Sequence, residues 1–147
     1  MACANASAHD AGAERRGLLD GVHVLVVDDE DDPRELFRDV LELAGAHVSV
    51  ASSARAALAA IEDHVPDVLV TDIMMPSEDG YWLIEAVRAI RDATGRRHPR
   101  ALAITGDRWR HPRSRAVDAG FDAELTKPIG IETLCETVAR LAGRYRD

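Results

Sequence analysis

Short apolar runs alternate along the chain with longer segments in which apolar residues recur every three or four positions. Runs rich in Val, Leu and Ile are typical of buried strands in a parallel sheet, and the longer segments predict amphipathic helices that cover its faces. This alternation predicts an α/β fold, a doubly wound (βα)5 three-layer sandwich with a central five-stranded parallel sheet. The predicted strands are 22–27, 47–51, 67–71, 101–105 and 123–126.

Local signals predict how the helices between these strands begin and which sides they bury. Asp32 is predicted to cap the first helix, with Pro33 at its first position, and Leu36 is expected on its buried side. Ser53 is predicted to cap the second helix. Ile131 is expected to pack inward at the start of the last helix.

The first 20 residues are rich in Ala, Gly and charge, without apolar periodicity. We therefore expect residues 1–20 to be a flexible leader or a linker remnant. One domain is predicted over 21–143, and 144–147 form a short tail. The chain is expected to end without an output domain, as a stand-alone or excised unit.

The chain is acidic: 18 Lys and Arg against 26 Asp and Glu give a net charge of −8. Direct binding of nucleic acid is therefore not expected, because it needs clustered positive charge. The basic stretch 108–115 is the local exception. A solvated loop and helix start is the favoured interpretation of it, and a partner-docking surface is the alternative.

Cysteine and histidine usage indicates neither a disulfide framework nor a zinc site. Cys3 and Cys135 are the two cysteines, which suits a reducing compartment. The six histidines are scattered singly and are interpreted as structural or surface residues. No apolar run reaches the roughly 20 residues needed to cross a bilayer, and no signal peptide is evident. We expect a cytoplasmic protein without membrane insertion.

Acidic residues follow two of the predicted strands: Asp28 and Asp29 follow the first strand, and Asp72 follows the third. Ligands of such sheets bind beyond the carboxyl ends of the strands, so these carboxylates are expected to share one crevice. Packed together, they would raise one another's pKa unless a cation joined them. Three carboxylates suit Mg²⁺ best, with Mn²⁺ as a substitute.

Two further strand ends supply groups for phosphoryl chemistry. Asp72 stands alone at its strand end, so it is the candidate nucleophile that could form an aspartyl phosphate. Thr105 ends the fourth strand and Lys127 follows the fifth. A hydroxyl, an ammonium and Mg²⁺ would together neutralise the charge on a transferring phosphoryl group.

These motifs, in this order, resemble the receiver domain of bacterial response regulators, the CheY-like superfamily, over about residues 21–143. The details are most similar to receivers of hybrid histidine kinases and to single-domain response regulators. The motifs that carry the resemblance are Val26-Val27-Asp28-Asp29-Glu30, Asp72-Ile73-Met74-Met75-Pro76 with Asp79-Gly80, Ile104-Thr105-Gly106, and Leu125-Thr126-Lys127-Pro128.

The resemblance implies a role for each acidic residue of the site. Asp72 would be the phosphoacceptor, while Asp28 and Asp29 would hold Mg²⁺, Asp29 more directly. Asp72 itself and the backbone carbonyl of Met74 would complete the metal ligands.

For the remaining motifs, the resemblance implies that Thr105 and Lys127 engage the phosphoryl group and that the Lys127-Pro128 peptide is cis. It also implies the flavodoxin-like strand order 2-1-3-4-5.

The implied function is that of a phosphoacceptor in a two-component or phosphorelay system. The phosphoryl donor would be the phosphohistidine of a sensor histidine kinase or a histidine phosphotransfer protein. A downstream protein would bind the face formed by the helix at 112–119, the strand at 123–126 and the last helix. Such a domain catalyses its own phosphorylation and hydrolysis, and is not an enzyme in the usual sense. Whether it forms a homodimer is left open.

The chain departs from the receiver pattern at the position three before Lys127. Many receivers carry an aromatic residue there that turns inward on phosphorylation, whereas this chain has Glu124. A carboxylate is not expected to enter an apolar slot, so we expect no aromatic rotamer switch at this position. Met74 and Asp107 are expected to flank the phosphoryl site and to tune hydrolysis.

Three other classes of protein are alternatives to this interpretation. An Asp-nucleophile phosphatase similar to the haloacid dehalogenases needs a second acid two residues after the nucleophile, where this chain has Met74. A flavin binder needs a Ser-, Thr- or Gly-rich first loop, and Asp28-Asp29-Glu30 would repel its phosphate. A receiver-like module that signals without phosphorylation is the alternative that stays open.

Overall fold

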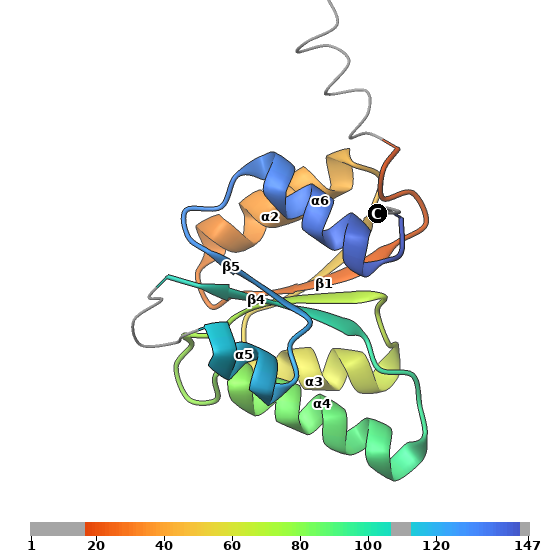
Figure 1. Cartoon of the computed structure of the whole chain (residues 1–147), viewed down its shortest axis with the longest axis vertical. Coiled ribbons are helices and arrows are strands. Elements are labelled where there is room, and N and C mark those ends of the chain that lie inside the picture. The colour runs from red at the N-terminus through yellow and green to blue at the C-terminus, as the bar shows by residue number, and fades with distance from the viewer. Residues whose placement is uncertain (1–16, 107–112, 145–147) are drawn as a thin grey trace, which may run out of the picture.

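The computed structural model describes residues 17–106 and 113–144, and its five strands form one sheet in the order β2-β1-β3-β4-β5 (Figure 1). Every neighbouring pair of strands is parallel. The predicted fold class and strand order are therefore confirmed. The strands are β1 (His23–Val27), β2 (His47–Ala51), β3 (Val68–Asp72), β4 (Arg100–Thr105) and β5 (Ala123–Thr126). The helices, with the labels of Figure 1, are α2 (Asp31–Leu43), α3 (Ala54–Asp63), α4 (Gly80–Thr94), α5 (Arg113–Ala119) and α6 (Ile131–Leu141).

The helices form a layer on each face of the sheet: α2 and α6 cover one face, and α3, α4 and α5 cover the other (Figure 1). Alternate side chains of a strand point to opposite faces, so each buried strand feeds two cores. Val24 and Val26 of β1 belong to the core under α2 and α6. Leu25 and Val27 belong to the core under α3 and α4. This double burial explains why the strands are continuous apolar runs.

Helix α2 begins at Asp31, so the predicted cap at Asp32 is wrong. Glu30 is the N-cap and makes no side-chain capping bond. The chain is instead fixed just before the helix, because the Glu30 N–H donates to Oδ1 of Asp28 at 2.9 Å. The prediction for Ser53 is confirmed, since its side chain accepts from Ala56 N at the start of α3.

Two apolar residues expected to be buried are exposed: Leu36 is 53% and Ile131 is 49% accessible. In α2 the buried residues are Phe37, Val40 and Leu41, which share one side of the helix. Leu36 lies beyond the edge of that side. The interpretation of these two positions as core was wrong.

The packed body extends into the segment expected to be a leader. Leu19 is fully buried in the core under α2 and α6. Its N–H donates to the carbonyl of Ala44 at 2.9 Å, which fixes the backbone as well. Residues 17–20 therefore belong to the fold, and residues 1–16 lie outside the described part of the chain.

No helix in the described ranges is long and apolar enough to cross a membrane.

Candidate functional site

The three aspartates predicted to converge lie together at the carboxyl edge of the sheet. β1 and β3 are neighbours with Val27 opposite Thr71, so the residues that follow them meet. One carboxylate oxygen from each of Asp28, Asp29 and Asp72 lies within 4.8 Å of the other two. Asp28 and Asp72 are buried, and Asp29 is exposed.

Burial makes the two inner carboxylates hard to ionise. Loss of hydration raises the pKa of Asp28, and the negative charges of Asp72 and Asp29 add to this effect. Burial likewise raises the pKa of Asp72, although the ammonium of Lys127 opposes it. The cluster therefore carries an electrostatic cost that a bound cation would relieve.

The donor set fits a hard divalent cation. Oδ1 of Asp28 accepts the Glu30 N–H, but Oδ2 is buried and has no hydrogen-bond partner. An unpartnered buried carboxylate oxygen is costly unless a ligand satisfies it. Within residues 17–106 and 113–144, this is the one group of three or more acidic, His or Cys residues whose ligand atoms all lie within 4.8 Å of one another. Mg²⁺ prefers such carboxylates together with water.

Lys127 and Thr105 reach the same edge from the other half of the sheet. Nζ of Lys127 donates to Oδ2 of Asp72 at 3.3 Å. The backbone N–H of Lys127 donates to the carbonyl of Thr105 at 2.8 Å, which ties the ends of β4 and β5 together. Thr105 is fully buried. The Lys127-Pro128 peptide is cis, as the resemblance implied.

The loop after β3 wraps around Asp72. The backbone nitrogen of Met74 donates to Oδ1 of Asp72 at 3.4 Å. Met74 itself is 43% exposed. Gly80 packs closely against the same loop: a Cβ at this position would lie only 2.8 Å from the carbonyl oxygen of Asp72. Asp79 caps α4 by accepting the Trp82 N–H. Asp107, the other expected neighbour of the phosphoryl site, lies outside the described residues.

Glu124 is half-buried on β5, and an aromatic side chain reaches this part of the molecule from a different position. Tyr81, at the start of α4, is 6% exposed and packs edge-on to Phe121, with ring centroids 6.3 Å apart. The guanidinium of Arg115 lies 4.3 Å from the Tyr81 ring centroid. Burial raises the pKa of Tyr81, the charge of Arg115 opposes this and the charge of Glu124 adds to it.

Tyr81 was not predicted from the sequence as part of this region. Its position directly after the Asp79-Gly80 motif was the available signal. The contact with Phe121 and Arg115 joins residues 34 or more positions apart, so the sequence pattern did not reveal it.

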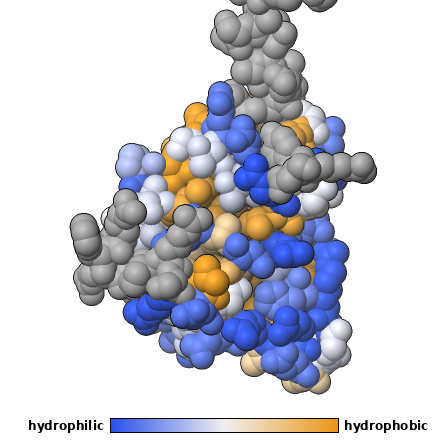
Figure 2. All heavy atoms as spheres, in the orientation of Figure 1, coloured by the Kyte–Doolittle hydropathy of each residue, from blue (hydrophilic) through white to orange (hydrophobic). Residues whose placement is uncertain are grey.

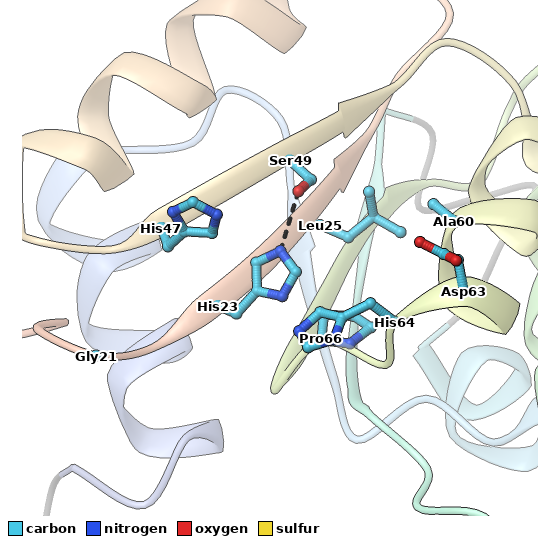
Figure 3. A pocket seen from close by; sticks show the side chains of 9 residues that line it. All are labelled: Gly21, His23, Leu25, His47, Ser49, Ala60, Asp63, His64 and Pro66. Carbon is cyan, nitrogen blue, oxygen red and sulfur yellow. Dashed lines mark hydrogen bonds between the residues drawn. The ribbon is translucent and has the colours of Figure 1, made fainter.

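Three histidines that look isolated in the sequence gather at the amino edge of the sheet (Figure 3). His23 lies between the other two, with ring centroids 5.1 Å from His47 and 4.9 Å from His64. Nε2 of His23 is 3.0 Å from the Ser49 hydroxyl, and its Nδ1 is buried without a hydrogen-bond partner. The histidines are scattered along the sequence, and the fold brings three of them into one cluster at the surface.

A five-stranded parallel sheet with acids, a threonine and a lysine at its carboxyl edge defines a class of α/β signalling domain. The family model described as the response regulator receiver domain matches residues 24–139. The chain belongs to this family, whose members are receiver domains of two-component and phosphorelay systems. Receiver domains generally bind Mg²⁺, and the acidic cluster is an arrangement that could hold it.

Curated relatives agree with this assignment. The chain is 42% identical over 106 residues to an uncharacterized 14.6 kDa protein of Leptolyngbya boryana, covering 72% of this chain and 79% of that protein. It is 38% identical over 127 residues to the virulence sensor protein BvgS of Bordetella pertussis, covering 82% of this chain but 10% of BvgS. The chain thus spans about a tenth of that relative. The predicted likeness to receivers within larger sensor proteins is confirmed.

The solved structures give the same result. The chemotaxis response regulator CheY4 of Vibrio cholerae superimposes with a TM-score of 0.71 at 30% identity, covering 82% of this chain and 98% of that one.

Proposed function

We propose that this receiver domain accepts a phosphoryl group on Asp72 from a phosphohistidine donor, and that Asp28 and Asp29 hold the Mg²⁺ that this transfer needs. The observation that carries the proposal is the geometry at the carboxyl edge. Three carboxylates converge within 4.8 Å, one of their oxygens is buried without a partner, and Nζ of Lys127 lies 3.3 Å from Asp72.

The chemistry follows from the residues present. A carboxylate oxygen of Asp72 attacks phosphorus and forms a mixed anhydride, while the P–N bond to the donor imidazole breaks and the imidazole leaves with the electron pair and takes up a proton. Lys127 and Thr105 stabilise the charge on the phosphoryl oxygens. Asp28, Asp29, Asp72 and the Met74 carbonyl would hold Mg²⁺, which would supply further neutralisation of charge when bound. Water later hydrolyses the anhydride, at a rate that Met74 and Asp107 tune.

In this proposal the domain is a switch in a signalling pathway, and it turns over no metabolite. Its phosphoryl donor is a sensor histidine kinase or a histidine phosphotransfer protein. One relative, named as the sensor histidine kinase RcsC of Salmonella typhimurium, is 30% identical to this chain over 127 residues. The downstream protein binds the face formed by α5, β5 and α6. We place the domain in the cytoplasm, without direct contact to nucleic acid.

The test is incubation with acetyl phosphate and Mg²⁺, followed by intact-mass measurement. We expect wild type to gain the mass of one phosphoryl group, and expect no gain for Asp72→Ala or when EDTA replaces Mg²⁺. Asp39→Ala, which removes an exposed aspartate of α2, is the matched control and should gain the same mass as wild type.

Wild type that gains no mass would overturn the phosphoacceptor role. In that case a pull-down partner bound equally by wild type and Asp72→Ala would favour a receiver-like module that signals without phosphorylation. Mass gain by Asp72→Ala would place the phosphoryl group on another residue.

A further inference from the structure

A polar pocket of about 380 Å³ lies at the opposite edge of the sheet from the aspartates. It is formed where α4 ends, β4 begins and the chain turns from α5 into β5, and its lining residues are Arg88, Arg91, His98, Arg100, Gly120 and Asp122. Arg100 and Thr105 are the two ends of β4, so at roughly 3.3 Å per residue the pocket is about 17 Å from the candidate phosphoryl site. The two sites are distinct.

The lining of this pocket is positively charged on a protein whose net charge is −8. Arg88, Arg91 and Arg100 contribute three guanidinium groups, against the single carboxylate of Asp122. Hydrophilic side chains cover this part of the surface, at the lower right of the molecule (Figure 2). A local excess of positive charge in a concave site attracts small anions.

The carboxylates nearby do not neutralise these arginines. Oδ1 of Asp122 is 3.5 Å from Arg100, while its Oδ2 accepts the backbone N–H of Ala101 at 2.8 Å. Arg91 pairs with Asp92 in a solvent-exposed contact at 3.2 Å, which is a weak interaction that an incoming anion can displace. The pocket therefore retains cationic groups for a ligand.

Arg88 is held in place before any ligand arrives. Its Nη1 donates to the carbonyl of Ala119 at 2.9 Å. Its side chain lies against Gly120, where a Cβ would be 2.7 Å from Arg88 Cδ and where φ is +118°. Glycine is needed there both for the backbone angle and for the approach of the arginine. A positioned guanidinium loses less entropy on binding than a free one.

His98 adds a polar group without a use in the proposed phosphoryl chemistry. It is half-buried, and its Nε2 is buried without a hydrogen-bond partner. Burial lowers the pKa of His98. The positive charges of Arg91 and Arg88 lower this pKa further, and the negative charge of Asp122 opposes the decrease. An anion in the pocket would offset these positive charges and favour the imidazolium.

We propose that this pocket binds a small phosphorylated molecule through Arg88, Arg91 and Arg100, with His98 as a further donor. The planar guanidinium fork matches phosphate oxygens in bidentate contacts, and Arg88 and Arg91 lie one helical turn apart on α4. The volume is that of a small-molecule site. The pocket goes beyond the proposed phosphotransfer and does not depend on it.

Isothermal titration calorimetry with inorganic pyrophosphate, in a buffer that contains EDTA, tests the proposal. We expect saturable binding to wild type, binding at least tenfold weaker to the double variant Arg91→Gln/Arg100→Gln, and unchanged binding to Arg55→Gln. Arg91 and Arg100 have exposed side chains, so their replacement should leave the fold intact. Arg55 is an exposed arginine outside the pocket and serves as the matched control.

Two further measurements separate this pocket from the phosphoryl site. Asp72→Ala should bind pyrophosphate as wild type does, because the pocket lies at the other edge of the sheet. NMR titration should show the pKa of His98 rising when pyrophosphate is added. The proposal is overturned if wild type shows no saturable binding at millimolar pyrophosphate, or if the double variant binds as tightly as Arg55→Gln.

Discussion

Asp28 is the residue at which burial and charge conflict most directly. It is 1% exposed, faces two other carboxylates and has one unpartnered oxygen. Its raised pKa means that the folded protein binds this proton more tightly than the unfolded chain does. Ionised Asp28 therefore lowers stability at every pH above the folded-state pKa, unless a cation compensates.

We predict that Asp28→Asn raises the free energy of unfolding in EDTA at neutral pH by about 1 kcal/mol, because a neutral amide of the same shape removes a buried charge. Mg²⁺ at ten times its dissociation constant should stabilise wild type by about 1.4 kcal/mol and leave Asp28→Asn unchanged. Urea denaturation measures both effects.

Glu42→Gln, an exposed position of α2, is the control and should behave as wild type in both conditions. A loss of stability for Asp28→Asn in EDTA would show that the ionised carboxylate is already well accommodated.

At the scale of elements, the phosphoryl site depends on how α4 meets the end of β3. A Cβ at Gly80 would lie 2.8 Å from the Asp72 carbonyl oxygen and 2.9 Å from Ile73 Cα, both of which are backbone atoms. The Gly80 N–H also donates to the Ile73 carbonyl at 2.9 Å. The helix start and the reactive loop are thus packed backbone to backbone.

We predict that Gly80→Ala lowers the free energy of unfolding by about 2 kcal/mol, because the loop carrying Asp72 must move away from α4. Gly106→Ala is the matched control. Its nearest contact would be Lys127 Cδ at an ordinary 3.8 Å, so its stability should change little.

Chemical denaturation gives the two stabilities, and acetyl phosphate labelling tests whether Gly80→Ala also slows phosphorylation. Equal free energies of unfolding for Gly80→Ala and Gly106→Ala would contradict this prediction, because they would show that the loop accommodates the added methyl group without loss of stability.

At the scale of the whole molecule, the sheet brings together histidines from β1, from β2 and from the end of α3 (Figure 3). Burial lowers the pKa of His23, and the neighbouring His64 and His47 lower it further. The negative charge of Asp67 opposes this decrease. Between the ordinary value near 6.5 and the lowered value, the unfolded chain binds more protons than the folded protein. Stability from this group is therefore present at higher pH and is lost as pH falls through that window.

We predict that acidification from about pH 7.5 to 5.5 destabilises wild type more than His23→Gln, by up to about 1 kcal/mol. Comparing the two variants cancels the contributions of the buried aspartates, which have the opposite sign. By NMR, the pKa of His23 should rise in His64→Gln, because a repelling neighbour is removed, and should stay unchanged in His98→Gln.

An equal pH dependence of wild type and His23→Gln would show that His23 titrates as freely in the folded protein as in the unfolded chain.

The sequence by itself determined the sheet and helices, the fold class and the strand ends that carry Asp28, Asp72, Thr105 and Lys127. These features are encoded in local periodicity and in residue type at the ends of apolar runs, so they need no knowledge of distant neighbours. Local signals were weaker at the helix starts. The N-cap of α2 is Glu30 and not the predicted Asp32. The side chain of Asp28, which lies outside the helix, accepts the backbone N–H of Glu30 at this point.

The tertiary structure alone decided which side chains meet. It exposed Leu36 and Ile131, buried Leu19, grouped three histidines and placed Arg88 beside Gly120. Each of these results depends on the packing of elements that are distant in the sequence, and periodicity within one element does not contain that information. The physical reason is that burial and electrostatics act through space, between residues that only the folded sheet and its two helical layers bring into contact.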